Sequence, residues 1–206
     1  MNTEKIEQAP ATGAPELDGD YWNTRWEKGE TGWDIGYASP AITEYINGLP
    51  NKGLHILVPG CGNAYEAQHL VNNGFSRITL LDIAPEAVAR LNKQFNNGSV
   101  QVLCADFFGH EGQYDLVLEQ TFFCALPINR RGDYVRKMAE LLKPGGTIAG
   151  VLFASEFEKE GPPFGGTEEE YRALFAPYFH IQHMEPCRNS IPPRQGNELF
   201  ISLIKK

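Results

Sequence analysis

Short apolar runs alternate with segments of helical spacing along most of this chain. Five apolar runs have the length of buried strands, and they lie at 54–58, 77–81, 100–104, 114–118 and 147–153. Helices are predicted in three of the intervals between these runs, at 64–73, 85–96 and 133–142. Strands that alternate with helices are joined by right-handed crossovers. The pattern therefore predicts an α/β fold with a mostly parallel, doubly wound sheet and helices on both of its faces.

Both ends of the chain depart from this alternation. Residues 1–18 are polar and contain Pro and Gly, which predicts a flexible tail before a single domain at 19–206. Residues 19–50 precede the first strand, and we expect them to form a cap over the carboxyl end of the sheet. Two further apolar runs, near 180–185 and 199–204, predict a seven-stranded sheet with an antiparallel C-terminal strand.

Charge and hydropathy narrow the classes of partner. The chain of 206 residues has a formal net charge of −8, and its basic residues never cluster beyond pairs. Nucleic-acid binding needs a basic face, so no nucleic-acid partner is expected. No apolar run approaches the roughly 20 residues of a membrane span, so no membrane segment is expected either. The predicted partner is a small molecule, and the predicted state is a monomer or a weak homo-oligomer.

The four cysteines lack the spacing of a metal site. Cys61, Cys104, Cys124 and Cys187 form no CxxC pair, so no metal centre is predicted. The N-terminal residues contain no apolar secretion signal. Reduced thiols and a cytoplasmic location are therefore expected.

A glycine turn follows the first predicted strand. Gly60 and Gly62 stand between this strand and a helix, and glycine lets the backbone approach a ligand closely. Free N–H groups at the start of that helix would point toward the ligand. Asp82 ends the second strand about 20 residues later, where a carboxylate accepts hydrogen bonds from ribose hydroxyls. Asp82 could instead cap the helix that begins near Pro85.

The glycine turn does not match the sites of phosphate-bearing nucleotides. A dinucleotide site needs a third small residue three positions after the second glycine, and Tyr65 occupies that position. The chain also lacks the phosphate-binding loop of ATP and GTP sites. A nucleoside without phosphates fits better, and S-adenosylmethionine is the common ligand of this kind.

Residues at the ends of the next strands extend the predicted site. Asp106 ends the third strand and can accept a hydrogen bond from an adenine amino group, while Phe107 offers a stacking surface. Glu119 or Gln120, at the end of the fourth strand, would face the methionine part of the ligand.

All three tryptophans precede the first strand. Trp22 and Trp26 are four residues apart, which places them on one face of a short helix, and Trp33 follows them. Two interpretations remain open. The tryptophans anchor this arm to the core, or they also line the ligand pocket, where aromatic faces favour a cationic sulfonium.

Taken together, these segments resemble the thiopurine S-methyltransferase superfamily, and especially its plant halide and thiol methyltransferase branch. The matching segments span nearly the whole chain after the tail, at 21–27, 32–36, 59–62, 81–83, 105–108, 121–126 and 161–163. The two tryptophan segments and the Thr-Phe-Phe-Cys-Ala-Leu run at 121–126 are the most specific of them.

The resemblance implies a Rossmann-like methyltransferase that moves the methyl group of S-adenosylmethionine to a small soft nucleophile such as a thiol, thiopurine, thiocyanate or halide. It implies cofactor contacts from Trp22, Trp26, Trp33, Gly60, Asp82, Asp106, Phe107 and Glu119. The plant branch resembles Gly-Pro-Pro-Tyr, with the tyrosine near the acceptor, at the position where this chain has Gly-Pro-Pro and Phe164. That difference suggests a more apolar acceptor pocket.

The catalytic residues stay unassigned at this level. No His-Asp or Cys-His arrangement looks dedicated to catalysis. Arg188 and Arg194, in a late loop, are candidates for orienting an anionic acceptor, and the alternative is that both are solvated loop charges. Two other functions remain open: a small-molecule O- or N-methyltransferase, and a non-catalytic sensor that binds S-adenosylmethionine.

Overall fold

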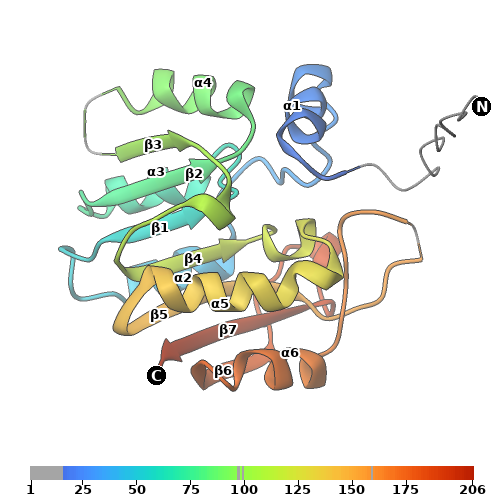
Figure 1. Ribbon diagram of the computed structural model, residues 1–206. Coiled ribbons are helices and arrows are strands. Elements are labelled where there is room, and N and C mark those ends of the chain that lie inside the picture. The colour runs from blue at the N-terminus through green and yellow to red at the C-terminus, as the bar shows by residue number, and fades with distance from the viewer. Residues whose placement is uncertain (1–15, 97, 99, 159) are drawn as a thin grey trace, which may run out of the picture.

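Seven strands form one mixed sheet in a computed structural model that describes residues 16–96, 98, 100–158 and 160–206. Residues 1–15 of the predicted tail lie outside the described residues. The strands are β1 (Ile56–Pro59), β2 (Ile78–Asp82), β3 (Val100–Cys104), β4 (Tyr114–Gln120), β5 (Leu142–Phe153), β6 (Phe179–Pro186) and β7 (Glu198–Lys205). Their order across the sheet is β3-β2-β1-β4-β5-β7-β6 (Figure 1).

The order reverses next to β1, which pairs in parallel with both β2 and β4. The pairs β2–β3 and β4–β5 are also parallel. β7 lies between β5 and β6 and runs antiparallel to both, so β6 points in the same direction as the first five strands. The predicted α/β fold, a mostly parallel sheet with an antiparallel C-terminal strand, is confirmed.

Helices cover both faces of the sheet, as Figure 1 shows. They are α1 (Gly19–Lys28), α2 (Pro40–Asn47), α3 (Tyr65–Asn72), α4 (Pro85–Gln94), α5 (Arg131–Leu141) and α6 (Glu168–Phe175). Successive side chains of a strand point to opposite faces, so Leu57 joins the core under α5 and α6. Its neighbours Ile56 and Val58 join the core under α2, α3 and α4. Both cores are thus built from the apolar runs that predicted the strands.

The fifth strand begins earlier than its apolar run indicates. The sequence predicts a strand from residue 147, after a Lys-Pro-Gly-Gly segment that ends a helix. In the structure β5 begins at Leu142, which pairs with Tyr114 of β4, and the register shifts before Thr147 pairs with Leu116. Gly145, at φ +75°, lies within this irregular stretch. Such a bulge contains turn residues, so the pattern alone does not identify it as strand.

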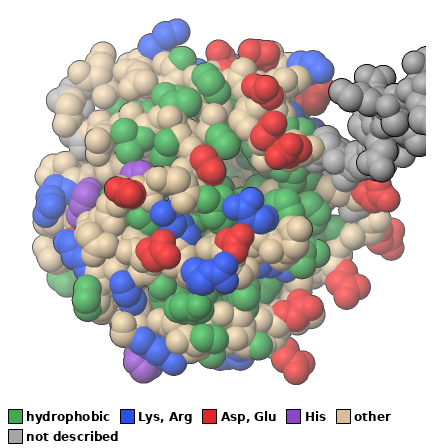
Figure 2. Space-filling model, viewed as in Figure 1, with side chains coloured by type: hydrophobic (Ala, Val, Ile, Leu, Met, Phe, Trp, Pro, Cys, Tyr) green, Lys and Arg blue, Asp and Glu red, His purple; other side chains and the backbone are tan. Residues whose placement is uncertain are grey.

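Charged side chains of both signs are interspersed on the face that Figure 2 shows. Over the whole sequence, 26 acidic residues outnumber 18 basic ones, which gives the net charge of −8. Within the described ranges, no helix combines the length and the apolar character needed to cross a membrane.

Two histidines near the amino ends of the strands should make the fold sensitive to acid. Burial lowers the pKa of His110, whose Nε2 atom lies 2.8 Å from the Tyr114 hydroxyl, and that of His55. The unfolded chain therefore takes up protons first, so their contribution to stability is complete above about pH 6.5 and declines as the pH falls below it.

We expect the Tm difference between the wild type and His110→Gln to narrow by a few degrees between pH 8 and pH 5.5. The variant lacks the group whose protonation is disfavoured in the folded state. Thermal unfolding followed by circular dichroism measures this difference, with His183→Gln, at an exposed position of β6, as the control. A constant difference for His110→Gln would contradict the prediction.

Candidate active site

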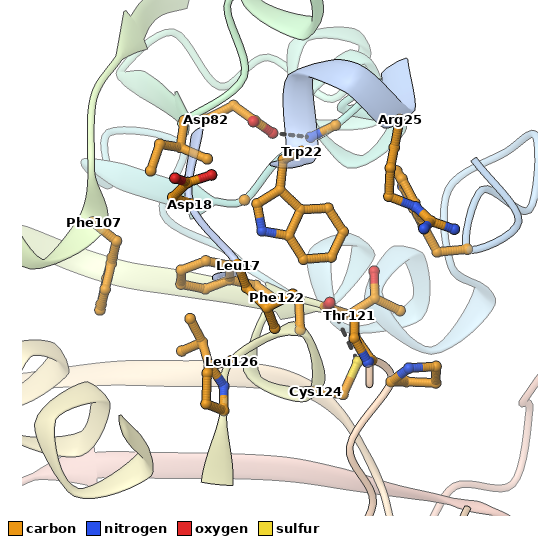
Figure 3. A pocket seen from close by; sticks show the side chains of 18 of the residues that line it. Leu17, Asp18, Trp22, Arg25, Asp82, Phe107, Thr121, Phe122, Cys124 and Leu126 are labelled. Carbon is orange, nitrogen blue, oxygen red and sulfur yellow. Dashed lines mark hydrogen bonds between the residues drawn. The ribbon is translucent and has the colours of Figure 1, made fainter. Parts of the chain in front are cut away.

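The carboxyl ends of β1 to β4 meet at a cavity of about 560 Å³, and Trp22 of α1 projects across it (Figure 3). Most of the residues predicted from the sequence line this cavity, namely Trp22, Trp26, Trp33, Gly60, Gly62, Asp82, Asp106, Phe107 and Arg194. Because parallel strands end at the same edge of a sheet, residues far apart in the chain come together here.

The glycine turn after β1 forms one wall of the cavity. Gly60 and Gly62 have φ angles of +56° and +51°, a left-handed conformation that glycine adopts without steric cost. A Cβ atom on Gly60 would lie only 2.3 Å from the Phe122 ring, so a side chain has no room there. On Gly62 it would lie 3.4 Å from the Trp26 ring. The turn is therefore enclosed by aromatic rings, and Gly60 is sterically required.

Asp82 links the glycine turn to the start of α4. Its Oδ2 atom accepts a hydrogen bond from Gly62 N–H, and its Oδ1 atom accepts one from Ala84 N–H, both at 2.9 Å. Burial raises the pKa of this carboxyl, although the backbone hydrogen bonds oppose the shift. Each carboxylate oxygen keeps a second lone pair. Asp82 can thus fasten the helix start and still accept a hydrogen bond from a ligand hydroxyl.

Asp106 and Phe107 follow β3 on an adjacent part of the wall. Asp106 caps a short 3-10 turn by accepting a hydrogen bond from Phe108 N–H at 3.1 Å, and its side chain is otherwise exposed. Phe107 is buried and meets the Phe122 ring edge to face, with the ring centroids 5.1 Å apart. A carboxylate and an aromatic face therefore lie side by side in the lining.

The three tryptophans both anchor α1 and line the cavity. Trp26 is buried against Ala84 and Ala87 of the α4 region, and Trp22 and Trp33 pack against the same cluster. The Trp33 ring meets Trp22 and Trp26 nearly at right angles, at centroid distances of 5.5 and 5.9 Å. The two interpretations of these residues are thus compatible, since one face packs on the core while the cluster borders the cavity.

Two predicted residues at the end of β4 lie outside the main cavity. Glu119 is completely buried, and its carboxylate accepts hydrogen bonds from Phe122, Phe123 and Tyr134. Gln120 lines a smaller adjoining hollow of about 60 Å³, where its Oε1 atom is buried without a hydrogen-bond partner among the described residues. Neighbouring residues of a strand point in opposite directions, so the two side chains diverge.

Two predicted acceptor residues also lie away from the cavity. The segment before Phe164 supplies Pro162 and Pro163 to the lining, whereas Phe164 does not line it. Its N–H donates a hydrogen bond to Cys124, and its carbonyl accepts one from Arg131. Arg188 is exposed and does not line the cavity either. Of the three predicted acceptor residues, Phe164 and Arg188 are therefore the two that do not line this cavity.

Arg194 does reach the cavity. Its guanidinium donates a hydrogen bond to the Trp33 carbonyl at 2.8 Å and lies 3.5 Å from Glu198. It also lies over the Phe153 ring, 5.3 Å from the centroid. Because the Arg194 side chain is 11% exposed and that of Glu198 is 6% exposed, the two charges form a mostly desolvated ion pair beside the cavity.

Sequence reasoning missed several residues of the lining, including Leu17, Asp18, Arg25, Phe108, Leu126, Arg130 and Phe153. Arg25 had a usable signal, because it follows Trp22 by three residues and so shares its helix face. Arg130 had none, since its position depends on the path of the chain after β4. Its guanidinium lies 4.0 Å from the centroid of the Phe108 ring.

Among the described residues, the cavity lining lacks two kinds of basic side chain, and its one thiol is not ionised. None of the described residues that line the cavity is a histidine or a lysine. Cys124 lines it, but burial raises the pKa of this thiol to about 12, and Sγ donates a hydrogen bond to the Thr121 carbonyl. Cys124 therefore stays protonated at neutral pH. In the described part of the chain, no group of acidic, histidine and cysteine side chains is suited to hold a metal ion.

A family model for thiopurine S-methyltransferase matches residues 17–202. This chain belongs to the thiopurine S-methyltransferase family. The match includes the tryptophan arm, the glycine turn and the loops that line the cavity. Family membership confirms the resemblance and the predicted cofactor, so the protein is a methyltransferase that uses S-adenosylmethionine.

Two curated relatives illustrate the range of this methyltransferase family. A probable thiol methyltransferase 2 of Arabidopsis thaliana is 33% identical over 186 residues, which cover 86% of this chain and 81% of that protein. A thiopurine S-methyltransferase of Vibrio cholerae is 29% identical over 178 residues, with 77% and 81% of the two chains covered.

Solved structures of other methyltransferases share the fold. Magnesium protoporphyrin IX methyltransferase of Synechocystis, with bound S-adenosylmethionine, has a TM-score of 0.74 at 14% identity, covering 95% of this chain and 100% of that one. A Burkholderia thailandensis 1,6-didemethyltoxoflavin-N1-methyltransferase has a TM-score of 0.73 at 17% identity, covering 100% and 98%. The likeness supports the Rossmann-like methyltransferase fold.

Proposed function

We propose that this methyltransferase transfers the methyl group to the sulfur of a small thiol or thiopurine, or to a comparable soft nucleophile such as thiocyanate or a halide. One observation carries the proposal: among the described residues, the side of the cavity formed by Phe122, Phe153, Pro162, Pro163 and Arg194 contains no histidine, lysine or carboxylate that could serve as a general base. Oxygen acceptors generally need such a base. Thiocyanate and halides need none, and a free thiol with a pKa of about 8.5 is partly ionised at neutral pH.

The names of the relatives point to the same acceptor atom. They include a probable thiol methyltransferase, thiocyanate methyltransferases and thiopurine S-methyltransferases. Their shared feature is a soft sulfur acceptor on a small molecule, which we transfer to this chain as part of the proposal.

S-adenosylmethionine would bind along the ends of β1 to β4. In this proposal Asp82 accepts from the ribose hydroxyls, Asp106 accepts from the adenine amino group, and Phe107 contacts the adenine ring. Gly60 and Gly62 give the close backbone approach. The unpartnered Oε1 atom of Gln120 fits an ammonium donor in the hollow beside the glycine turn.

The arm at 19–50 would act as the cap of a single methyltransferase domain. Trp22, Trp26 and Trp33 present aromatic faces and edges to the cavity, and such faces stabilise a cationic sulfonium. When bound, S-adenosylmethionine supplies an electrophilic methyl group on that sulfonium. The chain contributes position and exclusion of water rather than a proton acceptor.

The acceptor would lie on the side of the cavity formed by Phe122, Phe153, Pro162, Pro163 and Arg194. These side chains are mostly apolar, so they exclude water from the nucleophile. The Arg194 guanidinium favours the thiolate over the thiol through its positive charge. In-line displacement needs the nucleophile held behind the methyl group, and orientation of this kind supplies much of the acceleration.

A panel of acceptors tests the proposal. The purified protein is incubated with S-adenosylmethionine and one acceptor at a time, and formation of S-adenosylhomocysteine is measured. The acceptors are a thiol, a thiopurine, thiocyanate and iodide, with a phenol, a carboxylate and an amine for comparison. We expect turnover with at least one sulfur acceptor, at a rate that rises with pH through the pKa of that acceptor's own thiol. Turnover confined to phenols, carboxylates or amines would overturn the proposal.

We expect Arg194→Gln to raise KM for an anionic thiol by about tenfold and for a neutral thiol much less, since one desolvated charge contact is worth about 1–3 kcal/mol. Steady-state kinetics with the two thiols measure this difference. Arg188→Gln is the matched control, because Arg188 is exposed and does not line the cavity. Equal KM changes for the two thiols would contradict a role of Arg194 in acceptor binding.

A further inference from the structure

A buried carboxylate lies beneath the cavity wall. Glu119 has no exposed surface. Its Oε1 atom accepts hydrogen bonds from the backbone N–H groups of Phe122 and Phe123, both at 2.9 Å. Its Oε2 atom accepts a hydrogen bond from the Tyr134 hydroxyl of α5 at 2.6 Å. These three donors engage both oxygens of the carboxylate from two different elements.

Burial of the Glu119 carboxylate costs free energy, because the charged group loses its hydration. Burial raises the pKa of Glu119 to about 7, and the three hydrogen bonds only partly oppose that shift. None of the ion pairs among the described residues includes Glu119. An apolar side chain would avoid the desolvation but would leave two buried N–H groups without an acceptor. What distinguishes Glu119 is therefore its capacity to accept hydrogen bonds.

The segment that Glu119 holds is a strained turn. Thr121 lies between Glu119 and the two amides, and its φ angle is +57°. A left-handed conformation is rare for a β-branched residue. Such strain persists only where the surroundings over-determine the conformation, and it often accompanies functional sites. Because the carboxylate binds the two amides that follow Thr121, it helps to hold the backbone of Thr121 in this left-handed conformation.

This turn separates the two sides of the cavity. Thr121, Phe122 and Cys124 lie across the cavity from Asp82 (Figure 3). The Phe122 ring occupies the space above Gly60, where a Cβ atom would be 2.3 Å away. It is thus in direct contact with the turn proposed to hold the methyl donor.

The same turn reaches the acceptor side. The Cys124 carbonyl accepts a hydrogen bond from Phe164 N–H at 2.7 Å. This contact ties the turn to the segment whose Pro162 and Pro163 line the cavity. Displacement of the turn would therefore move the donor wall, formed by the glycine turn at Gly60 and Gly62, relative to the acceptor wall, formed by Pro162 and Pro163.

We propose that Glu119 is a positioning residue for methyl transfer: by accepting from the amides of Phe122 and Phe123, it holds the turn that aligns the acceptor with the methyl donor. Glu119 itself touches neither reactant. The alignment matters for any acceptor, so the inference does not depend on sulfur being the methylated atom.

Three substitutions of Glu119 separate hydrogen bonding from charge. Glu119→Leu removes both acceptor atoms at similar volume. Glu119→Gln keeps one oxygen for the two amides and removes the charge. Glu119→Asp keeps the charge but shortens the reach. Leu203→Ala, at a fully buried position of β7, is the control for loss of stability alone.

The measurements are kcat with the best acceptor of the panel, the Kd of S-adenosylmethionine by calorimetry, and the folded fraction by circular dichroism. We expect Glu119→Leu to lower kcat at least about thirtyfold and Glu119→Asp about tenfold, because small misplacements of reactants cost up to about a hundredfold. The Kd should change by less than about fivefold, and Glu119→Gln should retain kcat within about fivefold.

Two results would overturn the inference. The first is that Glu119→Leu has the same kcat as Leu203→Ala at equal folded fraction, which would mean that Glu119 only supports the fold. If Glu119→Leu does not fold, Glu119→Asp is compared with Leu203→Ala in its place. If Glu119→Gln loses as much kcat as Glu119→Leu, the negative charge and not the hydrogen bonding is required.

Discussion

Gly60→Ala is expected to lower the affinity for S-adenosylmethionine about a hundredfold. An alanine at φ +56° adopts a left-handed conformation that costs about 1–2 kcal/mol. Its Cβ atom would also lie 2.3 Å from the Phe122 ring, and overpacking of this kind costs about 1–3 kcal/mol. The glycine turn must move to relieve the backbone strain and the overlap with the ring. Because this turn is proposed to hold S-adenosylmethionine, its movement lowers the affinity. Calorimetric titration with S-adenosylmethionine measures the loss.

Gly74→Ala is the matched control for backbone strain. Gly74 has a φ angle of +84°, and no heavy atom lies within 4 Å of the Cβ position. This variant should lose stability but keep its affinity. Replacing Phe122 with alanine in the Gly60→Ala background should restore part of the affinity by relieving the contact. Unchanged binding by Gly60→Ala would show that the turn is not part of the donor site.

Asp82→Ala is expected to weaken binding of S-adenosylmethionine at least about tenfold, since a hydrogen bond to a charged group contributes about 1.5–3 kcal/mol. Two effects contribute. The variant loses the proposed contacts to the ribose hydroxyls, and it releases the Gly62 and Ala84 N–H groups that the carboxylate now holds. Calorimetry measures the affinity, and circular dichroism establishes that the fold is kept.

A double-mutant cycle separates these two effects. Wild type and Asp82→Ala are titrated with S-adenosylhomocysteine and with analogues that lack one ribose hydroxyl. A direct contact requires that the missing hydroxyl weakens binding to the wild type and not to the variant. Asp115→Ala is the control, because Asp115 lies at the start of β4, on the opposite edge of the sheet, and also accepts hydrogen bonds there, from His55 N–H and Lys143. Additive losses would exclude the ribose contact.

The fold was predictable because its determinants are periodic and local. Strands such as β2 are buried on both faces, so Ile78–Asp82 reads as an apolar run that ends in a single carboxylate. The donor-site candidates follow from the same logic, since the end of a strand in a parallel sheet is defined by the sequence. Asp82 and Asp106 could therefore be placed at the cavity without any knowledge of side-chain packing.

The remaining site residues could not be placed, because the pattern of apolar and polar residues does not show to which side of the sheet each side chain points. Glu119 and Gln120 are adjacent polar residues at the end of one strand, and nothing in their order says which face each meets. Glu119 turns under α5 to Tyr134, while Gln120 turns to the hollow by the glycine turn. The place of Phe164 could not be predicted for a related reason, because its backbone contacts are with Cys124 and Arg131, far away in the sequence.

The clustering of all three tryptophans around one cavity gives the protein a built-in optical probe. The chain contains no tryptophan besides Trp22, Trp26 and Trp33, and all three line the cavity. Their indole emission therefore arises from the walls of the site, without background from indoles elsewhere in the chain. Their edge-to-face contacts also allow excitation to pass between the rings, so a ligand that alters one ring alters the emission of all three. Occupancy of the site can thus be followed in real time without a label.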